Sequence, residues 1–462
     1  MTDLFAARAQ MAFSLGFHII FAVVGVAMPL LMVIAEYLYR RSGDGEYLEL
    51  AKRWSKGAAI MFAVGAVSGT VLSFELGLLW PTFMAYAGPI IGMPFSLEGF
   101  AFFFEAIFLG IYLYGWERVG PRAHLASGII VLISGSASAL FVVCANGWMN
   151  TPAGYSMVEG ELVSVDLWAA MWNPAALVEG LHMLTASFAA VGFAVAGIHA
   201  AMLLRGARRS FHSRALAIAL SVGGVFAFLS PLTGDLAAQQ VAELQPLKLA
   251  AMEGLWEDEA GAPLLIGGLP DEEAEVTRYG IEIPYALSLL ATHNPHAEIQ
   301  GIKSFPADER PPVAVTHIAF QIMVGCGTVM MLLAGFAGIQ ALRRRPIAAQ
   351  PRLLRALVLA SPLGVVAIEA GWTVTEVGRQ PWIIYGVMRT AEAVTPMPGL
   401  VVPFAGFMLL YGVLGVAVVV LLRRQVFAAE LGPLVQRGAE LGAEVGASVS
   451  SSAAGSEVDH DA

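Results

Sequence analysis

The sequence predicts an all-α, polytopic membrane protein, a bundle of nine transmembrane helices with its N-terminus outside and its C-terminus in the cytoplasm. Of the 462 residues, 57% are hydrophobic and 13% are charged, about half the charge of a typical soluble domain. The mean hydropathy is +0.69. The net charge of −10 also argues against nucleic-acid binding, which requires a basic surface. These values exclude an ordinary soluble enzyme, a disordered chain and a nucleic-acid-binding protein.

Nine apolar stretches are long enough to cross a bilayer as helices, because about 20 residues span the hydrocarbon core. They are residues 11–36, 57–80, 97–116, 125–149, 175–204, 215–233, 313–342, 353–376 and 399–422. The sixth is short, and the eighth contains Arg355 and Glu369. The apolar run of the eighth span is therefore split by charged residues.

Basic residues set the predicted orientation. Most of the 26 Lys and Arg residues lie in the loops after the first, third, fifth and seventh spans or after the last span. Loops rich in Lys and Arg remain in the cytoplasm. An odd number of spans then places the N-terminus outside and the C-terminus inside.

Four parts follow from this topology. Residues 1–233 hold the first six spans, 234–312 form a long outer loop, 313–425 hold the last three spans, and 426–462 form a tail. The loop carries 14 acidic residues, and a loop of this length is usually functional. The tail is small, polar and acidic, which predicts a disordered cytoplasmic extension.

Ionisable residues inside the spans are the main functional signal, because a charge at the bilayer centre costs about 2.5–3.5 kcal/mol. The spans contain His18, Glu75, Glu98, Glu105, Glu179, His182, His317, Glu369 and Glu376. We expect His18, Glu98, His182 and Met323 in the first two or three turns of their spans, so that polar groups gather in the outer half of the membrane. The inner halves hold almost no ionisable residues.

Histidines that face a methionine or a carboxylate in a helix bundle suggest haem iron ligands. Each residue also has a simpler interpretation: a hydrogen-bonded helix contact for a histidine, and core packing for a methionine. Glu98 and Glu105 are seven residues apart and share a helix face. Residue types and spacing alone leave open a haem protein, a proton relay, an ion-coupled transporter and structural contacts between helices.

Several segments resemble subunit I of the cytochrome bd quinol oxidases. They read FELGLLWP (74–81), FSLEGFAFFFEAIFLGIYLYGWER (95–118), SGSASALFVVCANGWMNTPAGY (134–155) and GWTVTEVGRQPW (371–382). QPLKLAAMEGLW (245–256), in the outer loop, is similar to the quinol-binding segment of that family. The matching segments occur in order along the chain, and the family also has nine spans and an outer N-terminus.

The resemblance implies a role for each candidate residue. His182 and Met323, the latter in AFQIMVGCG (319–327), resemble the axial ligands of the low-spin haem b. His18 and Glu376 resemble ligands of two high-spin haems. Among the remaining candidates, Glu98 resembles a second group at the oxygen-reducing haem and Glu105 a proton-path carboxylate. Four further residues resemble haem-pocket residues of the family: Arg8, Asn146, Trp372 and Arg379. Lys248 and Glu253 resemble residues that are linked to quinol oxidation.

The implied cofactors are a low-spin haem b, a high-spin haem b and a haem d, with haem b in place of haem d in some relatives. The implied partners are a second integral membrane subunit, a small single-span accessory subunit, quinol and dioxygen, in a bacterial or archaeal cytoplasmic membrane. Quinol would be oxidised at the outer face and dioxygen reduced to water with protons from inside, which generates a proton motive force without pumping. A transporter, or a dihaem carrier without oxygen chemistry, is the alternative.

Two features depart from part of that family. Gln321 stands two residues before Met323, where some members have arginine, so a charge near the low-spin haem is missing. The outer loop resembles the short form. Because the inner halves of the spans hold so few ionisable groups, we expect much of the proton path to lie in the partner subunit.

Overall fold

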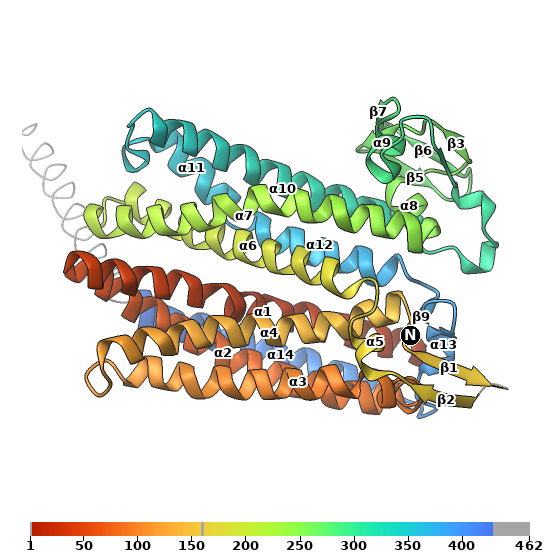
Figure 1. The fold of residues 1–462 in the computed structure, drawn as a ribbon, viewed down its shortest axis with the longest axis horizontal. Coiled ribbons are helices and arrows are strands. Elements are labelled where there is room, and N and C mark those ends of the chain that lie inside the picture. Colours follow the sequence, from red (N-terminus) through yellow and green to blue (C-terminus); the bar gives the residue numbers. More distant parts are fainter. Residues whose placement is uncertain (1, 159–160, 428–462) are drawn as a thin grey trace, which may run out of the picture.

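The computed structural model describes residues 2–158 and 161–427. Long helices lie side by side, and short strands and helices gather at one end (Figure 1). Within the described residues, nine helices are long and apolar enough to cross a membrane, which confirms the predicted helical bundle. Nearly all of the tail predicted for 426–462 lies outside the described residues.

The spans correspond to nine helical segments, in chain order. They are α1 (Asp3–Ser42), α2 (Gly45–Leu79), α3 (Pro81–Tyr114), α4 (Pro121–Asn150), α6 (Ala176–Leu204), α7 (Arg209–Leu244), α10 (Val313–Leu342), the pair α11 (Pro351–Ala360) and α12 (Leu363–Val377), and α14 (Val401–Leu422). The eighth span is divided into two helices at Ser361 and Pro362, because proline interrupts helical hydrogen bonding there.

Several helices extend well beyond their apolar windows. Helix α3 begins at Pro81 rather than at 97, with proline at the first helical position, where no partner for its nitrogen is needed. Helix α7 continues to Leu244 rather than 233, so the start of the predicted outer loop is helical. Glu98 therefore lies near the middle of α3 and His18 well inside α1, because both helices begin before their apolar stretches. His182 and Met323 do lie early in α6 and α10.

Small elements cap the end of the bundle at which α1 begins, called here the N-terminal end (Figure 1). Near α4 and α12 they comprise β1 (Tyr155–Val158), β2 (Glu161–Val165), α5 (Leu167–Met171), β9 (Trp382–Ile384), β10 (Met388–Arg389) and α13 (Thr390–Ala393). Strand β1 pairs with β2, and β9 with β10, both antiparallel.

The outer loop is a folded unit rather than an extended connection. It contains α8 (Pro246–Glu253), β3 (Glu259–Ala260), β4 (Leu264–Ile266), β5 (Leu269–Asp271), β6 (Val276–Arg278), β7 (Ile281–Ile283), α9 (Ala286–Thr292), β8 (Glu298–Ile299) and two 3-10 turns, η1 (Ile302–Ser304) and η2 (Ala307–Glu309). Strands pair as β3 with β8, β4 with β7 and β5 with β6. A third 3-10 turn, η3 (Ile347–Ala349), follows α10, and a π turn (Arg423–Phe427) follows α14.

Glycine brings α6 and α7 into direct backbone contact. A Cβ added to Gly192 would lie 2.4 Å from the Cα of Gly223. Small residues at helix crossings permit such close packing inside membranes, where hydrophobic burial does not drive helices together.

Ion pairs join two loops at the opposite end of the bundle. Arg214 pairs with Asp44 at 2.5 Å and with Glu46, and Arg208 pairs with Glu49 at 2.7 Å. The α6–α7 connection therefore lies beside the α1–α2 connection. This places two of the basic loops at the same end, as the predicted topology requires.

Candidate functional site

A buried polar network lies at the N-terminal end, where α4, α8 and α12 meet. Lys248 Nζ donates to Asn150 Oδ1 at 2.8 Å, and Arg379 donates to the same oxygen at 3.3 Å. Asn146 Nδ2 donates to Glu376 Oε1 at 2.6 Å, and Arg379 also pairs with Glu376. Four predicted site residues thus lie in one network, in which Asn150, a residue that the sequence did not single out, joins Lys248 to Arg379.

Lys248 is buried in this network instead of lying on an open loop. Its exposed fraction is 4%, and that of Arg379 is 2%. Burial, together with the nearby Arg379 guanidinium, lowers the pKa of Lys248 to about 7, and the Glu179 and Glu376 carboxylates oppose this shift. Lys248 can therefore change its charge near neutral pH.

Glu253 ends α8 on a different side from Lys248. It is 5% exposed, and its Oε2 has no hydrogen-bond partner among the described residues. Burial raises its pKa to about 8, although the Leu265 amide donates to it and opposes the shift. Such a carboxyl is largely protonated at neutral pH.

The two predicted histidine ligands share one hydrogen-bonding arrangement. Nδ1 of His18 lies 2.9 Å from Ser68 Oγ, and that hydroxyl donates to backbone carbonyls of α2. Nδ1 of His182 lies 3.2 Å from Thr233 Oγ1, whose hydroxyl faces carbonyls of α7. Each hydroxyl therefore accepts the Nδ1 proton, which leaves Nε2 as the nitrogen that can bind iron.

Each predicted axial ligand other than Glu376 also lies against a glycine of a neighbouring helix. An added Cβ would be 3.0 Å from His18 Cε1 at Gly69 and 3.1 Å from His182 Cε1 at Gly234. At Gly371 it would be 2.8 Å from Met323 Sδ. These three glycines leave room for the ligand side chains.

The remaining candidates have different surroundings. Trp372 and Glu369 of α12 face α1 at Gly16, close to His18 in the sequence. Arg8 is exposed near the start of α1, so its role stays a prediction.

The two candidate carboxylates of α3 face α4. The Oγ of Ser138 donates to Glu98 Oε1 at 3.4 Å. Glu105 is buried between α4 at Gly135 and α1 at Gly25, where an added Cβ would be 3.2 and 3.5 Å from its carboxyl.

A second buried cluster, at the opposite end, was missed. His124 Nδ1 lies 2.9 Å from Glu36 Oε1, and its Nε2 lies 2.9 Å from the Tyr112 carbonyl. Glu36 also pairs with Arg40. Glu36 and His124 lie at the edges of two predicted spans, where charges are usually solvated, and only the i, i+4 spacing of Glu36 and Arg40 hinted at a pair. The half of the bundle that the sequence predicts to face the cytoplasm therefore contains more ionisable groups than expected.

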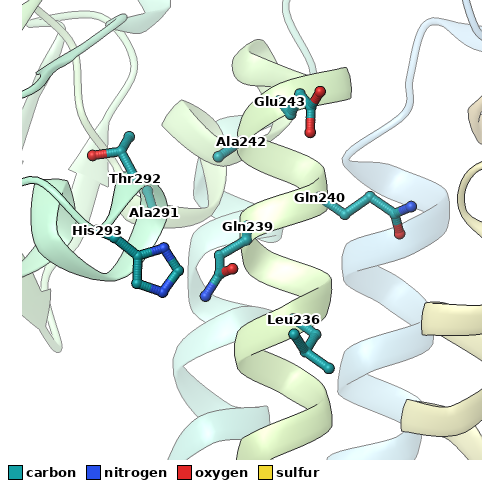
Figure 2. Close-up of a pocket in the computed structure, with 8 residues that line it drawn as sticks. All are labelled: Leu236, Gln239, Gln240, Ala242, Glu243, Ala291, Thr292 and His293. Atoms are coloured by element: carbon teal, nitrogen blue, oxygen red, sulfur yellow. The ribbon is translucent and has the colours of Figure 1, made fainter.

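A surface cavity of about 510 Å³ lies between the end of α7 and α9 (Figure 2). Gln239 of α7 and His293 after α9 lie on facing sides of it. None of the predicted ligand or quinol residues lines this cavity.

Comparison with known proteins identifies the family. The model of the cytochrome bd terminal oxidase subunit I family matches residues 6–429. This chain belongs to that family. It is a multi-pass protein of a bacterial respiratory membrane and one subunit of a larger oxidase. The assignment excludes the transporter and the carrier without oxygen chemistry.

Individual relatives align with this subunit I along almost the whole chain. A Bacillus subtilis (strain 168) protein described as a cytochrome bd menaquinol oxidase subunit I is 38% identical, over 91% of this chain and 96% of its own. A cytochrome bd ubiquinol oxidase subunit 1 of the same organism is 33% identical, over 92% and 94%. The structure of the bd oxidase from Geobacillus thermodenitrificans superposes with a TM-score of 0.87 at 42% identity, covering 91% of this chain and 98% of that chain.

The family implies haem cofactors, and the residues of this subunit I fit them. The Nε2 atoms of His18 and His182 are left for iron, and glycines leave space beside three of the candidate ligands. Arg379 Nε and Glu369 Oε1 are buried without a partner among the described residues. A free guanidinium donor of this kind suits a haem propionate.

The Gly371→Ala substitution tests the space beside Met323. The new methyl group would overlap Met323 Sδ, so the flexible methionine side chain must move away from its present position. We expect a smaller fraction of six-coordinate low-spin haem in the reduced absorption spectrum. Gly338→Ala is the matched control, because Gly338 lies on α10 with open space around its Cα. Equal spectra for both variants would contradict the prediction that Met323 binds the low-spin haem.

Proposed function

We propose that this subunit oxidises quinol beside α8 and holds three haems, through which the electrons reach dioxygen. The observation that carries the proposal is the hydrogen-bonded network from Lys248 through Asn150 and Arg379 to Glu376. It joins the segment that resembles a quinol site to a candidate haem ligand. The relatives named as menaquinol and ubiquinol oxidases support the substrate class.

The ligand assignment is part of this proposal. His182 and Met323 would hold the low-spin haem b, and His18 and Glu376 the two high-spin haems, one haem b and one haem d or a second haem b. Arg379 and Asn146 orient Glu376, while Trp372 and Arg8 complete the haem pockets. Bound haem supplies one-electron transfer and an iron position open to dioxygen.

Glu253 and Lys248 would have different roles in quinol oxidation. Quinol loses two electrons and two protons when it becomes quinone. The Glu253 carboxylate can accept a hydroxyl proton at Oε2, which has no other partner among the described residues. Lys248, on another side of α8, can polarise a quinol oxygen while its charge is balanced by Glu376 and Glu179.

The reduction of dioxygen to water needs protons, and α1, α3 and α4 carry groups that could deliver them. Glu105 contacts α1 at Gly25 and α4 at Gly135. On the same faces, about three turns on, lie Glu36 of α1 and His124 of α4, while Tyr112 follows Glu105 by about two turns of α3. We propose that protons enter this path at the Glu36–His124 pair and move from there to Glu105. The distance along the helices is about 16 Å.

The complete enzyme needs a second integral membrane subunit, since this chain is subunit I. A small single-span subunit is a further candidate partner. The decisive test is oxygen uptake by the purified complex with reduced menaquinol and ubiquinol analogues, together with its reduced-minus-oxidised spectrum. A pale complex without oxygen uptake would refute the proposal.

Glu253→Gln tests the proton acceptor. Because the pKa of Glu253 is raised to about 8, its accepting carboxylate form increases as the pH rises through that value. We expect wild-type quinol oxidation to rise from about pH 6.5 to about pH 8.5. The Gln variant should be slow and lack this rise. Glu259→Gln, at an exposed position in the same loop, should retain it. A rise that persists in Glu253→Gln would remove Glu253 from the reaction.

A further inference from the structure

Two side chains at the start of α10 bind the outer loop around Glu253. His317 Nδ1 lies 2.8 Å from the Met252 carbonyl, and Nε2 lies 3.0 Å from the Gly267 carbonyl. Gln321, one turn further along α10, donates from Nε2 to the Leu265 carbonyl at 3.0 Å and accepts from the Gly267 amide at 2.9 Å. One helix face thus holds both the end of α8 and the β4–β5 turn.

These contacts involve the backbone on both sides of Glu253. Met252 precedes it in α8, and Leu265 is the residue whose amide donates to its carboxyl. When Gln321 fixes the Leu265 carbonyl, it also fixes the peptide that follows Leu265 and the path of β4. An added Cβ at Gly254 or Gly268 would lie 3.2 and 3.3 Å from the His317 ring nitrogens, so the chain passes close to the imidazole on both sides.

His317 is enclosed by the backbone of the outer loop. Its ring nitrogens face two carbonyl oxygens, which only accept hydrogen bonds. The ring has no exposed surface, so it fills the space between the end of α8 and the β4–β5 turn. The outer loop and the region of α12 pack around this part of α10. Their ionisable groups there are Lys248, Glu253, Asp271, Glu272, Glu376 and Arg379. Helix α7 contributes the apolar Val241 there.

We propose that His317 and Gln321 are positioning residues for quinol oxidation, because they hold the Leu265 amide against the Glu253 carboxyl. The inference rests on the proposed role of Glu253. The hydrogen bond from the Leu265 amide favours the carboxylate form. Without this hydrogen bond Glu253 holds its proton more tightly and accepts one from quinol only at higher pH.

The test uses the complete oxidase with Gln321→Met, which keeps the side-chain length but removes both hydrogen bonds to the loop. Hydrogen–deuterium exchange of the peptide around Gly267 measures the contact itself. We expect exchange, corrected for intrinsic rate, to increase about tenfold, as for one lost hydrogen bond. The rise of quinol oxidation with pH should move upward by up to about one pH unit. His317→Phe, which keeps a buried ring, should act in the same direction.

The control is His296→Phe, an exposed ring of the same loop beside Tyr285, which should change neither measurement. Unchanged exchange in both α10 variants would overturn the inference. Faster exchange with an unmoved pH profile would reduce the two residues to a structural role and also overturn it. If Glu253→Gln leaves the wild-type profile intact, the proposed function of Glu253 fails, whereas the exchange data still report on the contact. If His317→Phe does not assemble, Gln321→Met decides alone.

Discussion

Met323→Leu should abolish the low-spin haem spectrum and reduce quinol-driven oxygen uptake to background. Leucine matches the volume of methionine but has no sulfur to bind iron, and loss of one of two axial ligands converts a six-coordinate iron to a five-coordinate one. The reduced-minus-oxidised spectrum of the purified complex measures the change directly. Haem content by pyridine haemochrome shows whether haem is lost or only its ligation.

The matched control is Met330→Leu. Met330 lies about two turns further along α10 and is 4% exposed in the main apolar core. Volume-conserving swaps of this kind usually cost less than about 1.5 kcal/mol, so the spectrum and activity should persist. An intact six-coordinate spectrum in Met323→Leu would show that another residue binds the iron.

Glu105→Gln should retain all haems and slow oxygen reduction by about 10². The amide is nearly the same size as the carboxyl and fits between Gly25 and Gly135, but it cannot accept and release a proton. Single-turnover reaction of the reduced enzyme with dioxygen separates this step from quinol oxidation. Electron transfer that needs no proton should remain fast.

Glu117→Gln provides the control, because Glu117 is exposed just after α3. Its activity should match the wild type. If Glu105→Gln also turns over at the wild-type rate, protons reach the oxygen site by another route. The Glu36–His124 pair would then not deliver protons for oxygen reduction through Glu105.

The nine spans could be predicted because hydropathy reports directly on the length of chain that a bilayer accepts. The full helices could not, since contacts outside the apolar windows extend them. Helix α7 continues to Leu244 through a polar stretch that precedes α8. The fold of the outer loop could not be predicted either, because strands of two or three residues are too short to show an alternation of apolar and polar residues.

Within the site, the sequence pointed to the ligand candidates but not to their supporting residues. Asn150 is a neutral amide and gave no signal, although it joins Lys248 to Arg379. Lys248 was expected to interact with quinol, yet a charge in an acidic loop is normally solvated, so its burial could not be foreseen. Gln321 stood out as a missing charge near Met323, whereas its side chain bonds the outer loop.

The seam between Gly192 and Gly223 has a practical consequence for engineering this subunit. No reporter group, cysteine label or bulkier residue can be introduced where the two backbones touch without wedging the helices apart. Positions such as Gly338 and Gly412, which have open space around them, are the natural anchors for fluorophores or spin probes. Distances measured between such probes would reveal whether α6 and α7 move as one rigid unit during turnover.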